Sequence, residues 1–390
     1  MSNNWNVVPF TEAVDICDTF RKPINSSERA SRIKGKEQSE LYPYYGATGQ
    51  VGFIDDYITD GEYVLLGEDG APFLDAFSNK AYIISGKTWV NNHAHVLRSK
   101  TNNKFLCYYL NSFNYKGYVS GTTRLKLTQA EMKRIPVPVP PLSEQERIVS
   151  RIEELFSQLD AGVETLKKTK AQLAVYRQAV LKEAFESVIP ESDTCNVEDV
   201  CKDIKVGIVI KPAQYYTSAD VGVRAFRSAN VREFAVNDSD WVYLTKAGHE
   251  ANLRSEIHTG DVLVVRSGYP GTACVVPPTY NGCNAIDILI AVPYAEKILP
   301  EYLCAYTNSP LGKRIIQEKK RGVAQAHFNV SGYSKTPIIV PCLETQKRVV
   351  AEIDSRLSVC DSIEQTVDTA LQQAEAMRQS ILKQAFEGRL

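Results

Sequence analysis

The sequence lacks any apolar run near the twenty residues that a membrane-spanning helix needs. Its first residues, MSNNWNVV, are polar and do not have the composition of a signal peptide. An excess of charge of one sign is missing too, because 45 basic and 46 acidic residues leave a formal net charge of −1. We therefore expect a cytoplasmic protein with no membrane partner. Any surface that binds a polyanion must be local and balanced by acidic surface elsewhere.

Signatures of several enzyme classes are absent as well. Gly86-Lys87-Thr88 resembles the end of a phosphate-binding loop, but Ala81 stands where that motif needs its first glycine. Pro277-Pro278-Thr279-Tyr280 resembles part of an amino-methyltransferase motif, but Val276 replaces the residue that must polarise the exocyclic amine. The glycines of residues 45–52 have the wrong spacing for a dinucleotide or S-adenosylmethionine loop. We expect a protein that is not an enzyme, with no catalytic residue and no cofactor of its own.

The nine cysteines include no Cys-x-x-Cys pair, and their number is odd. This usage fits buried thiols in a reducing compartment better than a disulfide framework. His93 and His95 stand two residues apart without a nearby cysteine or pair of carboxylates. The sequence therefore predicts no metal site.

What the chain does contain is one long stretch, twice. Residues 135–187 reappear at 336–388 without a gap and at a constant offset of 201 residues. Gln145 falls on Gln346 at this offset, and Ala184-Phe185-Glu186 falls on Ala385-Phe386-Glu387. A register shared over roughly fifty residues indicates a duplicated element.

Each copy is predicted to form a long helix. The proline-rich segment 136–141 cannot continue a helix and favours extended backbone, so the first helix begins after it. Apolar residues then recur every seventh position, which is typical of a coiled-coil seam, and the natural partner is the other copy. About 45 residues at ~1.5 Å each make a rod of roughly 65–70 Å. The seam consists of Ile152, Leu159, Leu166, Leu173 and Val180 in the first copy, and of Ile353, Cys360, Val367, Ala374 and Ile381 in the second.

The segments before the two helices are predicted to be mixed, mostly β modules, with short strands between turn clusters. Landmarks recur in them, because Asp60-Gly61 before one apolar strand is echoed by Thr259-Gly260 before another. We expect an α+β fold with two such modules and an antiparallel helix pair, related by a pseudo-twofold axis. The expected domains are residues 1–141, 142–187, 188–341 and 342–390.

These features resemble a known family. Pro-Pro141-Leu142-Ser-Glu144-Gln145 before a long helix that closes on Leu181-Lys-Glu-Ala-Phe-Glu186, repeated with the ending Leu382-Lys-Gln-Ala-Phe-Glu-Gly-Arg-Leu390, is similar to the specificity (HsdS-type) subunit of type I restriction–modification systems. Residues 44–49 and 91–95 also resemble segments that recur in one class of target-recognition domains. The second copy departs from the pattern, with Cys342 in place of Pro141 and Thr345 in place of Glu144.

The resemblance implies a DNA-binding subunit that reads a bipartite target in double-stranded DNA. Each module is then a target-recognition domain for one half-site, and the helix pair sets the spacer between them. The implied partners are two modification subunits, which use S-adenosylmethionine to methylate adenine N6, and restriction subunits, which use ATP and Mg²⁺.

Candidate DNA-binding residues are the donors and aromatic side chains of loops in the two modules. Each of them is alternatively a turn or surface residue. A basic stretch at residues 21–36 is either a solvated loop or a phosphate-contacting one. The candidates are Asn91, His93, Arg124 and Lys126 in the first module, and Arg266, Ser267, Tyr269, Arg321, Gln325 and His327 in the second.

Two other functions remain open at this stage. One is a coiled-coil scaffold whose two modules bind a protein or a carbohydrate instead of DNA. The other is an enzyme with an unrecognised site in the first module. DNA affinity that falls with salt would favour the DNA-binding interpretation over the scaffold, and methyl transfer by this chain alone would favour the enzyme.

Overall fold

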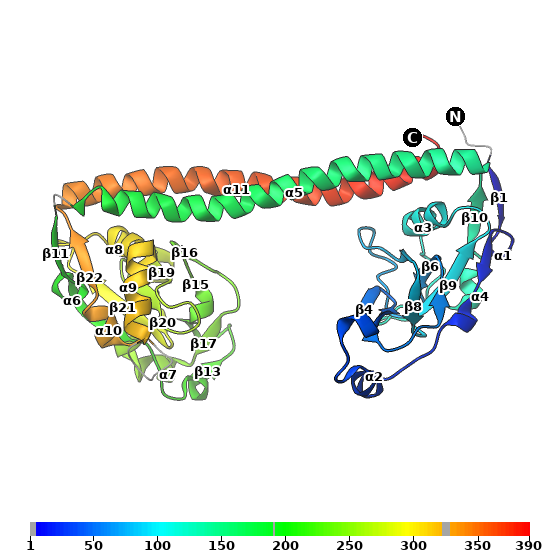
Figure 1. The fold of residues 1–390 in the computed structure, drawn as a ribbon. Helices are drawn as coiled ribbons and strands as arrows, with labels where there is room; N and C mark the ends of the chain where they lie inside the picture. The colour runs from blue at the N-terminus through cyan, green and yellow to red at the C-terminus, as the bar shows by residue number, and fades with distance from the viewer. Residues whose placement is uncertain (1–4, 190–191, 322–327) are drawn as a thin grey trace. The chain divides into compact units, whose positions relative to one another are not determined.

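The computed structural model describes residues 5–189, 192–321 and 328–390 (Figure 1). The chain divides into two compact units, with residues 1–167 and 367–390 in unit 1 and residues 168–366 in unit 2. Both long helices cross this division, so each unit contains one module and one part of each helix. The helices α5 (Leu142–Glu186) and α11 (Leu343–Phe386) begin within one residue of the expected starts.

Unit 1 contains a central antiparallel sheet in the order β2-β9-β6-β7, and a second sheet in the order β4-β3-β8-β5 in which β3 and β8 are parallel. A third pair, β1 with β10, lies next to the start of α5 in the chain. The strands are β1 (Asn6–Pro9), β2 (Val14–Ile16), β3 (Tyr42–Gly46), β4 (Gly49–Ile54), β5 (Thr59–Asp60), β6 (Tyr63–Gly67), β7 (Ala81–Ile84), β8 (Lys87–Val90), β9 (Ala94–Ser99) and β10 (Pro136–Val139). The helices are α1 (Phe10–Ala13), α2 (Ser26–Ile33), α3 (Asn103–Ser112) and α4 (Gln129–Met132).

Unit 2 repeats the strand order of the central sheet and the lone strand pair of unit 1, but its second sheet is ordered differently and it has one further two-stranded pair. Its central antiparallel sheet has the order β12-β21-β18-β19, its second sheet has the order β13-β17-β14-β20, and β11 pairs with β22. The strands are β11 (Asp193–Asn196), β12 (Cys201–Val206), β13 (Tyr216–Thr217), β14 (Val223–Phe226), β15 (Val231–Arg232), β16 (Ala235–Val236), β17 (Val242–Leu244), β18 (Val262–Val265), β19 (Ala273–Val275), β20 (Asn284–Ala285), β21 (Ile288–Pro293) and β22 (Pro337–Val340). The helices are α6 (Val197–Val200), α7 (Lys246–Glu250), α8 (Pro300–Asn308), α9 (Pro310–Arg321) and α10 (Val330–Ser334).

One helix in each unit is joined to its central sheet by a buried asparagine. In unit 1 the Asn111 carboxamide oxygen accepts a hydrogen bond from the Ala81 backbone N–H at 3.0 Å, and its Nδ2 donates to the Ala81 carbonyl at 2.8 Å. In unit 2 Asn308 makes the same two bonds to Ala273, at 3.0 and 2.8 Å. Because each amide satisfies both backbone groups of one strand residue, it fixes the register of α3 on β7 and of α8 on β19.

The two long helices pair antiparallel, as expected. In unit 2 the Arg177 guanidinium lies 2.5 Å from the Asp361 carboxylate, and in unit 1 Arg378 forms an ion pair with Asp160. These two pairs are equivalent at the offset of 201 residues, so the duplicated sequence makes the same cross-helix contact in both units. Such a reciprocal pair arises only when the two helices run in opposite directions.

The predicted seam lies on the covered side of the helices. Ile152 shares a cluster with Ile381 in unit 1, and Val180 shares one with Ile353 in unit 2. Among the ten seam positions, Leu159, Leu166 and Leu173 are half-buried and the others are buried. Cys360 on the seam is 1% exposed and fills a packing position, whereas Cys342 is the one exposed cysteine among nine free thiols.

The repeated Ala-Phe-Glu sequence joins each helix end to a module. Phe185 lies edge-on to Tyr302 and Tyr306, with ring centroids 5.2 Å away in each case. At the matching position, Phe386 lies 5.2 Å from Phe105 and 5.4 Å from Tyr109. The motif therefore recurs because each helix must be anchored to one module by an aromatic cluster.

The glutamine that follows each proline-rich segment holds the start of its helix. The buried Gln145 donates from Nε2 to the Pro140 carbonyl at 2.9 Å, and Gln346 donates to the Pro341 carbonyl at the same distance.

In the part of the chain that the structure describes, no helix combines the length and apolar character needed to cross a bilayer.

Candidate nucleic-acid interface

Each central sheet has one side, formed by the ends of its strands, from which several loops emerge together. In unit 1, β2 and β6 both run antiparallel to β9, which lies between them, so their C-terminal ends meet the N-terminal end of β9. In unit 2, β12 and β18 flank β21 in the same way. We call these two sites the loop edges. They comprise residues 17–21, 68–72, 91–93 and 120–127 in unit 1, and residues 207–211, 266–272 and 286–287 in unit 2.

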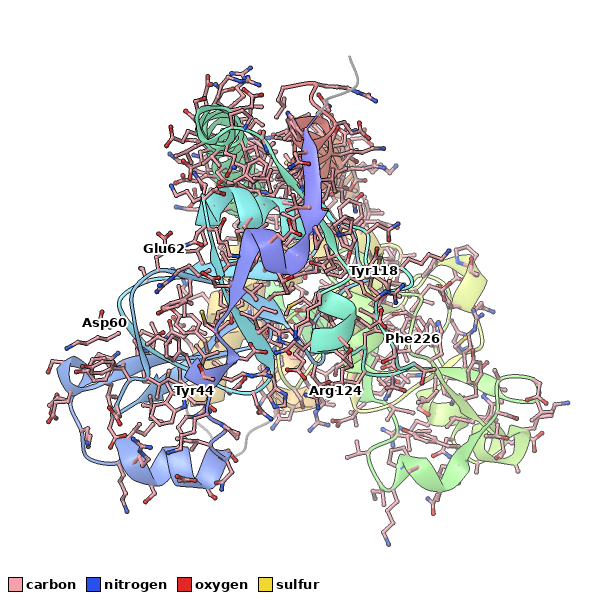
Figure 2. All side chains as sticks on the ribbon, turned by 90° about the vertical axis from the view of Figure 1, so that its right-hand side faces the viewer. Tyr44, Asp60, Glu62, Tyr118, Arg124 and Phe226 are labelled. Atoms are coloured by element: carbon pink, nitrogen blue, oxygen red, sulfur yellow. The ribbon has the colours of Figure 1, made fainter. Side chains whose placement is uncertain are left out.

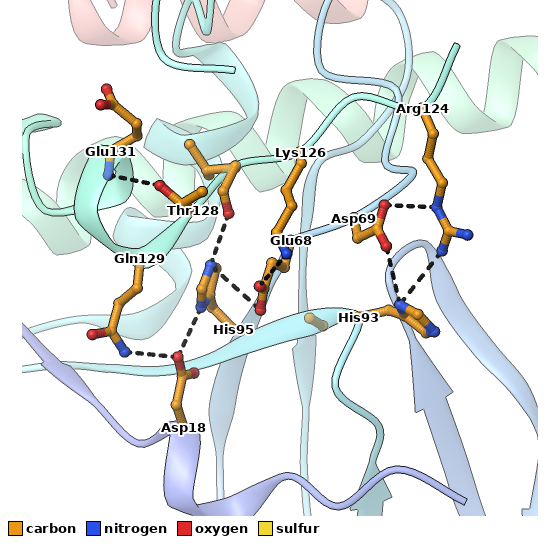
Figure 3. Close-up of polar contacts among 12 residues, drawn as sticks. Asp18, Glu68, Asp69, His93, His95, Arg124, Lys126, Thr128, Gln129 and Glu131 are labelled. Atoms are coloured by element: carbon orange, nitrogen blue, oxygen red, sulfur yellow. Dashed lines mark hydrogen bonds and ion pairs between the residues drawn. The ribbon is translucent and has the colours of Figure 1, made fainter. Parts of the chain in front are cut away.

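The unit 1 loop edge is organised by a buried histidine (Figure 3). His95 is 0% exposed. Its Nδ1 lies 2.8 Å from the Asp18 carboxylate, and its Nε2 lies 3.1 Å from the carbonyl of Leu127. Gln129 donates a further bond to Asp18 at 3.0 Å. His95 therefore ties the segment after β2 to the segment that carries Arg124 and Lys126, which is a structural role and not a metal site.

Acidic side chains hold the basic ones in place at this edge. Arg124 Nε lies 2.6 Å from the Asp69 carboxylate, His93 Nδ1 lies 3.6 Å from it, and Lys126 Nζ lies 3.5 Å from Glu68. The basic side chains remain 59%, 41% and 50% exposed, respectively. Figure 2 shows Arg124 on the side of unit 1 away from the long helices. The loop edge therefore presents oriented donors while its own charge is nearly balanced, so it favours directed hydrogen bonds over indiscriminate attraction of anions.

Three of the four residues predicted in the first module, His93, Arg124 and Lys126, are brought together here. Asn91 is placed differently. It is 9% exposed, and its carboxamide oxygen accepts a hydrogen bond from the His93 backbone N–H at 2.8 Å. Asn91 thus shapes the turn that presents His93. This is the turn role that the sequence left open as the alternative to DNA contact.

The ionised form of Asp18 stabilises this edge. Burial by itself would raise the pKa of Asp18, but hydrogen bonds from His95, the Val96 backbone N–H and Gln129 lower the pKa below its ordinary value. A carboxyl whose pKa is lower in the folded state contributes stability above its unfolded pKa of about 3.9 and loses it as the pH falls through the folded pKa.

We therefore expect Asp18→Asn to lower the free energy of unfolding of unit 1 by about 1–3 kcal/mol at pH 7. The difference in unfolding free energy between the two proteins should begin to shrink below pH ~4, where the unfolded chain binds a proton at Asp18, and should vanish once the pH is below the lowered pKa of the folded state. Denaturant unfolding at pH 7, 5 and 3.5 measures this. Asp15→Asn removes a 58% exposed carboxylate three residues away and is the matched control, with little expected effect. An equal loss in both variants at pH 7 would contradict the role of Asp18.

The unit 2 loop edge has different chemistry. The Arg266 side chain is only 14% exposed, lies 3.3 Å from the Asp287 carboxylate, and has a buried Nε without a hydrogen-bond partner in the described part of the chain. Tyr269, three residues further along the same loop, is 84% exposed. Its backbone N–H donates to the Ser267 carbonyl at 3.1 Å, and Gly268 has a φ of 79°, a conformation that favours glycine.

The remaining predictions in the second module are less defined. Arg321 ends α9, and its side chain is outside the described part of the chain, as are Gln325 and His327. The loop that carries Tyr269 borders a hollow of about 580 Å³. Ser228, Arg232, Ser267, Lys313 and Gln317 are among its lining residues.

The basic stretch at residues 21–36 is largely engaged within unit 1. The Arg29 guanidinium lies 4.7 Å from the centre of the Tyr44 ring, and that of Arg32 lies 5.1 Å from the Trp89 ring and 2.6 Å from Asp55. Stacking on aromatic rings and pairing with Asp55 orient these two cations on α2. This arrangement fits a solvated segment and a phosphate-contacting segment equally well.

Sequence reasoning missed the segment 207–211 of the unit 2 loop edge. Ile210 is 79% exposed there, but a short apolar run next to Pro212 gives no signal of exposure.

Within the described residues, no group of three His, Cys, Asp or Glu side chains is arranged to hold a metal ion.

Comparison with known proteins agrees with this architecture. Residues 4–174 match the family described as the type I restriction modification DNA specificity domain. A relative from Haemophilus influenzae that carries the name of a type I restriction enzyme specificity subunit is 28% identical over 377 residues, covering 94% of this chain and 91% of the relative. The EcoBI specificity subunit of Escherichia coli is 25% identical over 391 residues, covering 92% and 79%.

Solved structures show the same fold. A chain from a structural study of complex assembly and conformational transition of the type I R-M system has a TM-score of 0.73 at 16% identity, covering 100% of this chain and 99% of that chain. The HsdS subunit of Thermoanaerobacter tengcongensis has a TM-score of 0.54 at 16% identity, covering 100% and 98%. Two mixed modules with a pair of long helices are thus shared with these structures.

Proposed function

We propose that this chain, which belongs to the HsdS-type specificity subunits of type I restriction–modification systems, reads a bipartite target in double-stranded DNA with one half-site for each unit. One observation carries the proposal. The two units share the strand order of the central sheet, the asparagine clamps and the helix anchors, yet their loop edges present different side chains. A repeated scaffold with dissimilar loops is what two independent readers of unrelated sequences require.

The loop edges supply the chemistry for groove recognition. Arg124 and Lys126 in unit 1 can donate to phosphates, or to guanine O6 and N7 in the major groove. His93, beside Arg124, adds a further polar contact. In unit 2, Tyr269 projects an aromatic ring with a hydroxyl, and the same loop holds the largely buried Arg266. Electrostatic attraction is modest because the chain is nearly neutral, so base contacts supply much of the preference for the target.

The partner subunits supply the reaction in this proposal. Methylation of adenine N6 in a duplex requires the base to be flipped into a catalytic pocket, and S-adenosylmethionine belongs to the modification subunits. Restriction subunits bring ATP and Mg²⁺. This chain recognises the target sequence, and its long helices set the number of base pairs between the half-sites.

The test is a selection from random duplexes by the chain assembled with its modification partner, at two salt concentrations. We expect a bipartite motif with a fixed spacer. Arg124→Met is expected to weaken or relax one half of the motif only, and to reduce the dependence of log affinity on log salt if Arg124 contacts a phosphate. Lys182→Met removes a 62% exposed lysine of α5 and serves as the control.

Binding without any sequence preference, or without salt dependence, would contradict the proposal and favour a scaffold that binds other ligands. Relaxation of both halves by Arg124→Met would contradict independent reading by the two units.

A further inference from the structure

The two most exposed large apolar side chains in the described part of the chain lie at one site. They are Tyr269, at 84%, and Ile210, at 79%. Ile210 follows β12, and Tyr269 follows β18. Both strands run antiparallel to β21 between them, so both loops leave the same edge of the sheet, about 10 Å apart at their bases.

Asp287 links the two loops. Its backbone N–H donates to the Ile208 carbonyl at 3.1 Å, and its carboxylate lies 3.3 Å from the guanidinium of Arg266. The segment that carries Ile210 is therefore continuous with the surface proposed above to contact DNA.

The tip that carries Ile210 is held rigidly. Ile208 is 7% exposed and forms a bridge with Ile286, and a Cβ atom on Gly207 would lie 2.3 Å from the Ala285 carbonyl oxygen. Lys211 has a left-handed backbone, with φ 44° and ψ 53°, although it is not glycine and precedes Pro212. Such a conformation costs free energy and persists only where surrounding contacts impose it, which occurs most often at functional sites.

The apolar side chain at the matching place in unit 1 is less exposed, since Phe20 is 40% exposed. There the segment after β2 includes Phe20, whose ring packs edge-on against Tyr63 with centroids 5.9 Å apart. The Phe20 side chain is thus partly covered by its own module, whereas most of the Ile210 side chain is exposed. A projecting isoleucine is a feature of the unit 2 loop edge.

An isoleucine side chain offers no hydrogen bond, so it can distinguish bases only by apolar contact. On the base edges of the major groove, the C5-methyl group of thymine is the apolar group. We propose that Ile210 contacts a thymine methyl group in the half-site read by unit 2. The exposed Lys211 next to it is placed to contact a nearby phosphate. This inference rests on the proposed function, and it specifies that one of the bases read by unit 2 is a thymine.

The experiment compares the unchanged protein, Ile210→Ala and Val7→Ala, each assembled with the modification partner. Val7 is a 58% exposed residue of β1, outside both loop edges, and is the matched control. Selection from random duplexes identifies the position whose preference is lost in Ile210→Ala. We expect that position to be an A·T pair in one half-site, and the affinity for the selected target to fall roughly five- to twentyfold.

A second arm replaces that thymine with deoxyuridine, which removes only the methyl group. We expect this replacement to weaken the unchanged protein and Val7→Ala, and to have no effect on Ile210→Ala. Affinity for random DNA and its salt dependence should stay the same in all three, because no phosphate contact is changed. Thermal unfolding confirms that all three are folded.

The inference is overturned if Ile210→Ala keeps the full motif and affinity, if the relaxed position is a G·C pair, or if deoxyuridine weakens all three proteins equally. It is also overturned if Ile210→Ala loses its partner subunit instead of its base preference, since Ile210 then lies at a protein interface. Failure of the proposed function looks different, because the unchanged protein itself then selects no motif.

Discussion

Adding one heptad to each long helix is expected to lengthen the preferred DNA spacer by about two to three base pairs. Seven helical residues add about 10.5 Å, and one base pair spans about 3.4 Å. The cross-helix ion pairs Arg177–Asp361 and Arg378–Asp160 define where the insertions belong. Insertion after Gly162 in α5 and after Glu375 in α11 keeps both pairs, because each site lies between them.

The measurement is affinity for duplexes that carry the selected half-sites with spacers of different lengths. We expect affinity for the original target to fall by roughly a hundredfold, the size of one to two lost base contacts, and to recover on a longer spacer. A single insertion in α5 is the control. It shifts one ion pair against the other by about 10 Å, so we expect weak binding at every spacer. An unchanged spacer preference in the double insertion would mean that helix length does not set the spacing.

Phe185→Ala is expected to cost unit 2 about 3–5 kcal/mol of unfolding free energy, because it removes a buried aromatic ring. Phe185 is 1% exposed and lies against Tyr302 and Tyr306. Its loss leaves a cavity where the end of α5 meets α8. Hydrogen exchange of the full chain measures the effect, and protection of α8 and β19 should fall while that of β6 and β9 in unit 1 is retained.

The duplicated chain supplies the matched control for this substitution. Phe386 occupies the same place in unit 1 but is only half-buried, so Phe386→Ala should destabilise unit 1 by a smaller amount and leave α8 protected. Phe185→Leu should cost less than Phe185→Ala, since it leaves a smaller cavity. Equal loss of protection in both units after Phe185→Ala would show that the aromatic anchor is not local to unit 2.

The order of modules and helices could be predicted because it depends on local and periodic signals. A seven-residue apolar period and a proline-rich start act within a few turns of chain, and the offset of 201 residues implied that the copies are partners. The family assignment rested on the same motifs. The structure adds the reason for their recurrence, since Gln145 and Gln346 hold the helix starts and Phe185 and Phe386 anchor the ends.

The loop edges could be predicted only in part. Residue type alone grouped Asn91, His93, Arg124 and Lys126, but it could not show that Asn91 turns inward while the others face solvent. It also gave no reason to single out Ile210, because an apolar residue beside a strand is expected to be buried.

The sequence by itself thus determined that this protein has two modules and two paired helices, since periodicity and repetition act along the chain. Only the tertiary structure decided which side chains share a surface. The contacts that build the loop edges join residues far apart in sequence, such as Asp18 with Gln129 and Ile208 with Asp287. Strand order brings those residues together, and no local pattern encodes the direction in which a loop side chain then points.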